Sequence, residues 1–262
     1  MNPNDLMKDF YEKMGIKVGY NLNDRKEFQK VRNVLVNNNL PYENFDNNLK
    51  SLIIEKYNIN SYSPTRNKIN ILKGMKNLSH ELFHMASNKL DGSRNIGSML
   101  ESGVGNSLNE GITDYLTQEV DLNYDMYYIF EAFYFRILSR IYNGNKILVN
   151  HFNGNPEGVY DSFGRDRNLI LDITKCLDKY TKSVVNSSDA VDNKNFGDIY
   201  ISYDDFTDAF SEIFKRYSYQ NDPFYDKMLL SFRLLIDREF GLFDDEGKEI
   251  YDKFERKLKK GW

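Results

Sequence analysis

One stretch of the sequence decides the expected fold, and it reads Leu78-Ser79-His80-Glu81-Leu82-Phe83-His84-Met85-Ala86-Ser87. Leu78, Leu82 and Met85 recur at helical spacing, which predicts the apolar face of an amphipathic helix over residues 75–87. His80 and His84 are four residues apart and therefore lie one turn apart on the opposite face. We expect this helix to pack on one side and to carry polar chemistry on the other.

The spacing of the two histidines is typical of a metal site. Imidazoles at positions i and i+4 can converge on one ion, and Glu81 lies where it can reach a metal-bound water without being a ligand. The chain has only 3 His, so chance would produce this pattern about two times in a thousand. The alternative is a pair of surface histidines on an amphipathic helix. We predict that His80 and His84 bind zinc.

A zinc site in a hydrolase needs a third protein ligand and an open position for water. Two carboxylates, Glu101 and Glu110, follow the histidine helix closely enough to supply that ligand. Glu110 begins a second expected helix, over residues 109–120, and Asp114 follows it one turn later on the same face. Glu101 lies among Gly and Ser residues and has no such partner. We therefore predict Glu110 as the third ligand.

These two segments together resemble the gluzincin metallopeptidases of thermolysin type, whose second motif is Asn-Glu-x-x-Ser/Thr-Asp. The matching residues, within about residues 69–117, are His80-Glu81-Leu82-Phe83-His84 and Asn109-Glu110-Gly111-Ile112-Thr113-Asp114. The resemblance implies that Glu110 is the third zinc ligand and that Asp114 accepts a hydrogen bond from zinc-bound His80. It implies that Asn109 orients the two motif helices. It also implies peptide-bond hydrolysis by a metal-activated water, with Glu81 as the general base.

The residue that stabilises the negative charge developing on the substrate is not identified by a motif. The histidine that family members use for this purpose has no clear counterpart here. His151 is the one remaining histidine, and we expect it to take the catalytic role. Tyr115, Tyr142 and Tyr160 are alternatives for the same role. Residues 91–107 are expected to border the cleft.

The remaining pattern is mostly helical and predicts an α+β fold. It predicts a bilobal, gluzincin-like molecule with a small N-terminal sheet and an all-α C-terminal lobe, divided into residues 1–120 and 121–262. Short strands are expected at residues 69–72 and 199–202, and an irregular connection at residues 88–107. Helices are expected at residues 24–40, 48–57, 75–87, 109–120, 124–142, 166–185, 204–217, 223–240 and 245–260. The aromatic run at residues 124–135 is expected to lie mainly in the core.

Composition limits the possible partners. The chain of 262 residues carries a net charge of −4 without a segregated basic stripe, which argues against nucleic-acid binding. The single cysteine, Cys176, lies at helical spacing among apolar residues and is expected to be a core residue. No apolar run approaches the ~20 residues of a membrane span, and no signal peptide is recognisable, so we expect a cytoplasmic location.

The expected partner is therefore a peptide or protein substrate, while the oligomeric state is left open. A non-catalytic binding protein on a gluzincin scaffold is the rival class, and the presence of Glu81 disfavours it. A protease dedicated to a single target would use the same motifs, so that alternative stays open.

Overall fold

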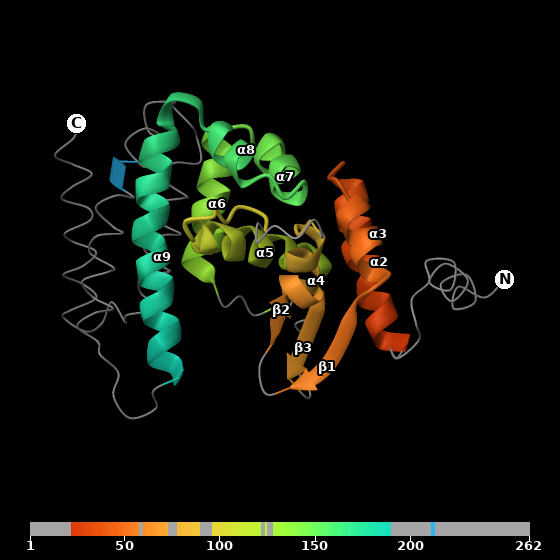
Figure 1. Cartoon of the computed structure of the whole chain (residues 1–262). Coiled ribbons are helices and arrows are strands. Elements are labelled where there is room, and N and C mark those ends of the chain that lie inside the picture. Colours follow the sequence, from red (N-terminus) through yellow and green to blue (C-terminus); the bar gives the residue numbers. More distant parts are fainter. Residues whose placement is uncertain are drawn as a thin grey trace.

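A computed structural model of the chain describes residues 22–57, 60–72, 78–89, 96–121, 124, 128–189 and 211–212. These residues form a mostly helical fold with one small sheet, which confirms the expected α+β class for this part of the chain (Figure 1). The elements are, in chain order, α2 (Leu22–Asn37), α3 (Glu43–Leu49), β1 (Ile53–Tyr57), β2 (Ser61–Ser63), the 3-10 helix η1 (Pro64–Arg66), β3 (Lys68–Leu72), α4 (Leu78–Ala86), α5 (Asn106–Val120), α6 (Ile129–Ile141), α7 (Gly144–Phe152), α8 (Pro156–Asp161), the 3-10 helix η2 (Gly164–Asp166) and α9 (Arg167–Asp189).

The sheet has the strand order β1-β3-β2, with β1 parallel and β2 antiparallel to β3. The strand expected at residues 69–72 lies within β3. The helix expected at residues 48–57 is wrong, because α3 ends at Leu49 and the second half of that segment is β1. Ile54 pairs in register with Ile69, so β1 takes its hydrogen-bond partners from a later strand. That partnership, together with the strand preference of β-branched isoleucine, decides the local structure.

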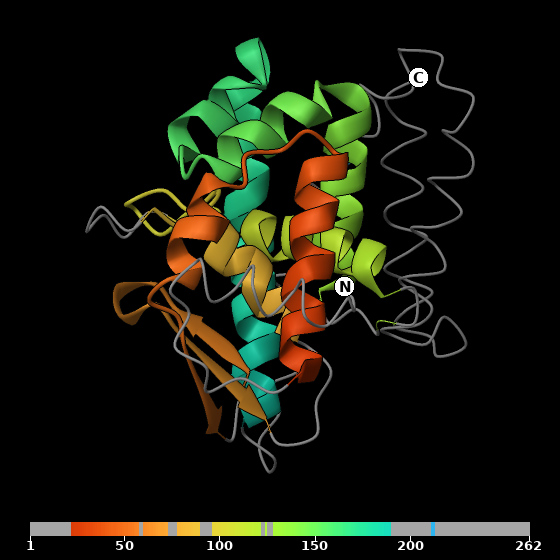
Figure 2. The same ribbon diagram turned by 90° about the vertical axis from the view of Figure 1, so that its right-hand side faces the viewer.

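Helix α4 lies at the centre of the described fold. It contacts α2 and α3, strands β2 and β3, and α5. Figures 1 and 2 show the sheet below α4, with α7 and α8 above it. All nine residues of α4 are buried, and the expected apolar positions Leu78, Leu82 and Met85 belong to the hydrophobic core. This burial fixes the orientation of the helix that carries His80 and His84.

Helix α5 is held by elements that follow it in the chain. Gly111 lets α6 approach closely, because a Cβ added there would lie 2.2 Å from the carbonyl oxygen of Glu131. No side chain of α5 itself caps its N-terminus. Instead Asp178 of α9 accepts hydrogen bonds from the backbone N–H groups of Gly105 (2.9 Å) and Ser107 (2.7 Å). Contacts from α6 and α9 therefore help to position α5, together with α4 and α2, which precede it in the chain.

Several boundaries differ from those expected. The connection after α4 is irregular as expected, with one β-bridge between Asn88 and Ile96, but α5 begins at Asn106 rather than at residue 109. Helix α6 begins at Ile129 rather than at residue 124, and its aromatic residues lie in the core. Helices α7 and α8 were not predicted. Cys176 is half-buried on α9 and packs against the core.

The predicted division at residue 121 stays a prediction, and α6 packs directly on α5 across it. The strand expected at residues 199–202 and the helices expected at 204–217, 223–240 and 245–260 lie outside the described residues, apart from residues 211–212, which are helical. Within the described part of the chain, no helix is both long and apolar enough to cross a membrane.

Candidate metal centre

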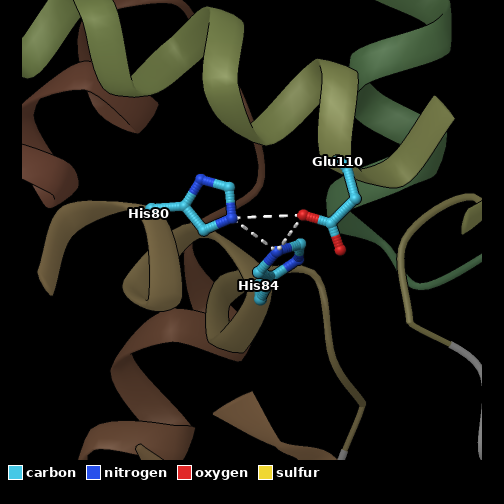
Figure 3. A group of neighbouring side chains, drawn as sticks. All are labelled: His80, His84 and Glu110. Atoms are coloured by element: carbon cyan, nitrogen blue, oxygen red, sulfur yellow. Dashed lines mark hydrogen bonds and ion pairs between the residues drawn. The ribbon is translucent and has the colours of Figure 1, made fainter. Parts of the chain in front are cut away.

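Three side chains from two helices converge on one point. His80 and His84 project from successive turns of α4, and Glu110 reaches them from α5 (Figure 3). The two Nε2 atoms are 3.0 Å apart, and Glu110 Oε2 lies 3.2 Å from His80 Nε2 and 3.1 Å from His84 Nε2. His80 and His84 are buried and Glu110 is half-buried, and the group has the residue types and spacing that can hold a metal ion. The expected convergence of Glu110 with both histidines is therefore present.

A buried carboxylate sets the ring orientation of His80. His80 Nδ1 lies 2.8 Å from Asp114 Oδ1, and Asp114 is completely buried. Asp114 also accepts hydrogen bonds of 2.7 Å from the Tyr124 hydroxyl and from the backbone N–H of Tyr128. Because a carboxylate accepts hydrogen bonds, Nδ1 of His80 carries a proton directed at Asp114, which leaves Nε2 as the nitrogen that faces Glu110 and could bind a metal.

The second histidine has neutral neighbours instead. His84 Nδ1 lies 3.0 Å from the amide nitrogen of Asn109 and 3.4 Å from the Thr113 hydroxyl. That hydroxyl lies 2.9 Å from the backbone carbonyl of Asn109, to which it donates. The prediction that Asn109 links the two motif helices agrees with this contact, which joins α5 to the end of α4.

The three converging atoms fit a metal ion in spacing and in charge. Tetrahedral coordination with bonds of about 2.0–2.1 Å places neighbouring ligand atoms about 3.3 Å apart, close to the separations found here. Burial lowers the pKa of His80, but the hydrogen bonds to Asp114 and Glu110 outweigh burial and raise that pKa to about 10. Burial raises the pKa of Glu110, and the two histidines reverse this effect, so that its pKa is lowered. The site thus favours a positive charge at the point where the three atoms meet.

Glu81 lies beside this point and lines a cavity of about 270 Å³. It is 5% exposed, and burial raises its pKa, although both histidines act in the opposite direction. The residues that line the cavity are Asn60, Ser61, Tyr62, His80, Glu81, His84, Ile96, Met99, Asn106, Asn109, Glu110 and Tyr128. The Glu81 carboxylate and the three residues that could bind a metal therefore line the same cavity.

The residues expected to stabilise the substrate oxyanion do not line this cavity. His151 is fully buried in the last turn of α7. Tyr115 packs against Phe135, the Tyr142 hydroxyl donates to Asp166, and Tyr160 is buried in the core. Direct contact of any of these side chains with a molecule in the cavity is therefore not supported.

Glu101, the alternative candidate for the third ligand, also lies away from the cavity. Glu101 lies on an exposed turn and lines a separate pocket together with Leu100, Ser102, Pro156 and Glu157. Its carboxylate is not part of the group formed by His80, His84 and Glu110.

Two tyrosines of the cavity were missed by the sequence reasoning. Tyr128 belongs to the aromatic run assigned to the core, yet it lines the cavity, and its ring centroid lies 6.1 Å from that of His80. Tyr62 comes from β2, and its hydroxyl contacts Asn88 (2.8 Å) and Asn67 (3.1 Å). The only signal for Tyr128 was its place shortly after the Asp114 motif, and β2 carried no chemical signature.

Comparison with family models, with curated proteins and with solved structures finds no match to this chain. The fold and the site define a class, namely an α+β protein with a candidate His-His-Glu metal centre beside a buried glutamate. Any functional assignment rests on this geometry and on the two motifs that supply it.

Proposed function

We propose that this protein is a zinc metallopeptidase of the gluzincin type, with its active site between an N-terminal α+β lobe and a helical C-terminal lobe. One observation carries the proposal. His80 Nε2, His84 Nε2 and Glu110 Oε2 meet within 3.2 Å of one another, next to Glu81, in the wall of a cavity. With a metal bound, Nδ1 of each imidazole would carry the ring proton, so that Nε2 of both rings and Oε2 of Glu110 could all direct lone pairs at one cation.

Zinc is the ion that best suits this set of ligands. Two imidazole nitrogens and one carboxylate are the ligands of several catalytic zinc sites, which leave one position open. Zinc bound by His80, His84 and Glu110 would lower the pKa of a water to about 7 and polarise a carbonyl group. Asp114 would hold His80 in the tautomer that binds metal and would raise its basicity.

Glu81 is the proposed general base. Its carboxylate lies in the cavity wall without being part of the ligand set, so it can take a proton from an attacking water and pass it to the leaving amine. Burial raises its pKa, which makes the carboxylate a stronger base than an exposed glutamate would be.

Tyr128 is the proposed donor to the developing oxyanion, in place of His151. It is the tyrosine of the cavity whose hydroxyl has no hydrogen-bond partner among the described residues, whereas that of Tyr62 contacts Asn67 and Asn88. Burial raises the pKa of Tyr128, and nearby carboxylates raise it further, so its hydroxyl stays protonated and can donate. A preorganised donor of this kind typically contributes about 100–1,000-fold to the rate.

An extended peptide is the substrate that the cavity favours. Ser61 and Tyr62 of β2 form one wall, and β2 is the terminal strand of the sheet in the described residues. An extended chain can add to such an edge through backbone hydrogen bonds, which places its carbonyl groups along the cavity.

Replacement of Glu81 tests the proposal. Glu81→Gln should retain about one zinc per chain and lose nearly all hydrolysis of a randomised library of quenched-fluorescence peptides, because an amide cannot accept the proton. Glu101→Gln is the matched control and should behave as wild type, because Glu101 is exposed and lies outside the metal-binding group. Wild-type activity in Glu81→Gln, or wild-type protein that binds no zinc, would contradict the assignment.

A further inference from the structure

Buried polar atoms without partners gather on the side of α5 that faces α7. They are the two ring nitrogens of His151 and the side-chain oxygen of Asn109, none of which makes a hydrogen bond within the described part of the chain. His151 is 0% exposed and Asn109 is 2% exposed. A buried polar group without a partner destabilises the folded state, so a group of them at one place calls for an explanation.

Gly97 shows that these atoms face the same small space. A Cβ added to Gly97 would lie 2.4 Å from Asn109 Oδ1 and 2.6 Å from His151 Nδ1. The backbone N–H of Gly97 donates to the carbonyl oxygen of Ser87 at 3.1 Å, which ties this loop to the end of α4. Glycine at this position therefore leaves room for the Asn109 amide and the His151 ring to approach each other.

Metal binding changes what His84 requires from Asn109. A metal on Nε2 leaves the ring proton on Nδ1, which then needs an acceptor. The amide nitrogen of Asn109, 3.0 Å from Nδ1, cannot serve as one, and the Thr113 hydroxyl oxygen is a longer contact at 3.4 Å. A half-turn of the amide places its oxygen against His84 and its NH₂ group on the side of His151. The NH₂ group then needs an acceptor on that side. The two ends of an asparagine amide are nearly equal in size, so the half-turn itself needs no repacking. Asn109 Oδ1 and His151 Nδ1 are unpaired among the described residues, so the hydrogen bond between the amide and His151 is one that forms with the metal-bound arrangement.

We propose that His151 is a positioning residue for the metal site. Its Nδ1 accepts a hydrogen bond from the Asn109 amide, and the amide oxygen in turn accepts from Nδ1 of His84, which keeps Nε2 of His84 directed at the metal. This inference rests on metal binding by His80, His84 and Glu110, but not on peptidase activity.

The surroundings of His151 suit an acceptor. Burial lowers its pKa, and His84 lowers it further, so the imidazole stays neutral and one ring nitrogen keeps its lone pair. Phe152 contacts the His151 ring in a T-shaped arrangement, with ring centroids 4.9 Å apart. Nε2 then carries the ring proton. The arrangement gives partners to Asn109 Oδ1 and His151 Nδ1, two of the three atoms that lacked them.

Nitrogen-15 NMR of the zinc-loaded wild-type protein tests the hydrogen-bond direction. The expected result is a neutral His151 ring with its proton on Nε2 and an unprotonated Nδ1. A ring proton on Nδ1 would overturn the proposal. This measurement needs no variant, so it remains decisive if a substitution at His151 prevents folding.

Zinc affinity, measured by competition with a chromogenic chelator, tests the consequence. His151→Phe keeps an aromatic ring in the core but removes both nitrogens, and it should weaken zinc binding about 3–10-fold, less than the loss of a residue that contacts the ligand directly. Phe152→Leu disturbs the same packing without removing a polar atom, and it should leave affinity within about twofold of wild type even if it lowers Tm.

A double-mutant comparison tests whether His151 acts on zinc affinity through Asn109. In an Asn109→Ala background, His151→Phe should cause no further loss of affinity, because the connection is already broken. An equal loss in both backgrounds, or wild-type affinity in His151→Phe alone, would overturn the positioning role while the zinc site stands. Wild-type protein that binds no zinc would overturn both the site and this inference.

Discussion

His80 and His84 are one turn apart on the same helix, but the two sides of the molecule that support them differ in chemistry. The α6 flank consists of Asp114, Tyr124, Tyr128 and Glu131, and it places a buried carboxylate 2.8 Å from His80. The α7 flank consists of Gly97, Asn109 and His151, and it places a neutral amide 3.0 Å from His84. One flank is charged, and the other is uncharged and tightly packed.

The difference indicates that the two flanks would support metal binding by the histidines in different ways. A carboxylate on the far nitrogen of an imidazole makes that ligand more basic and strengthens its bond to a metal. A neutral amide adds little charge and acts mainly by fixing the direction of the ring. We therefore expect changes in the α6 flank to act through charge and changes in the α7 flank to act through shape, and four predictions examine this comparison.

The largest effect is expected where the α7 flank is most tightly packed. Gly97→Ala places a Cβ 2.3 Å from His151 Cε1 at a residue with φ of 54°, so it combines backbone strain with a collision. Together these should lower the free energy of unfolding by about 3–4 kcal/mol, measured by urea denaturation. Gly103→Ala is the control, because φ is 83° but nothing lies within 4 Å of the added Cβ. It should cost only about 1–2 kcal/mol, and equal losses in both variants would refute tight packing at Gly97.

The next effect concerns a charge buried in the α6 flank. Burial raises the pKa of Glu131 from 4.5 to about 7, against the hydrogen bond from Thr181. The unfolded chain loses this proton near pH 4.5 and the folded protein near pH 7, so wild-type stability should fall as pH rises between these values. Glu131→Gln lacks the titration, and its stability relative to wild type should rise on the order of 3 kcal/mol between pH 5 and pH 8. Urea denaturation of chelator-treated protein checks this, and a difference independent of pH would contradict it.

Removal of the charge behind His80 should weaken zinc binding more than any other change outside the ligand set. Asp114→Ala is expected to reduce affinity about 10–100-fold, or about 1.4–2.7 kcal/mol, because His80 loses both its orientation and its anionic partner. Glu101→Ala is the control and should leave affinity unchanged. Chelator competition measures both, and equal affinities would refute the role of Asp114.

The smallest effect is expected at the amide behind His84. Asn109→Ala should weaken zinc binding about tenfold, or about 1.4 kcal/mol, because a neutral partner supplies direction without charge. The same chelator competition applies. A loss greater than that of Asp114→Ala would reverse the comparison between the flanks.

The sequence alone identified the components of the site that depend on local spacing. Two histidines one turn apart on a helix, and a glutamate and an aspartate one turn apart on another, must share a face because the helical repeat is 3.6 residues. Spacing therefore put His80 and His84 on one face and Glu110 and Asp114 on another, while the expectation that the two faces meet came from the resemblance of the two motifs to a known family. The described structure brings the four residues together.

Tertiary structure alone decided the features that depend on partners distant in the chain. β1 is a strand because β3 pairs with it, although residues 48–57 were expected to form a helix. Tyr128 faces the cavity because its backbone N–H binds Asp114, while its aromatic neighbours on α6 enter the core. His151 lies behind Asn109 because α7 packs beside the loop that carries Gly97. Local sequence specifies the direction of a side chain relative to its own helix, but packing between elements determines what that side chain meets.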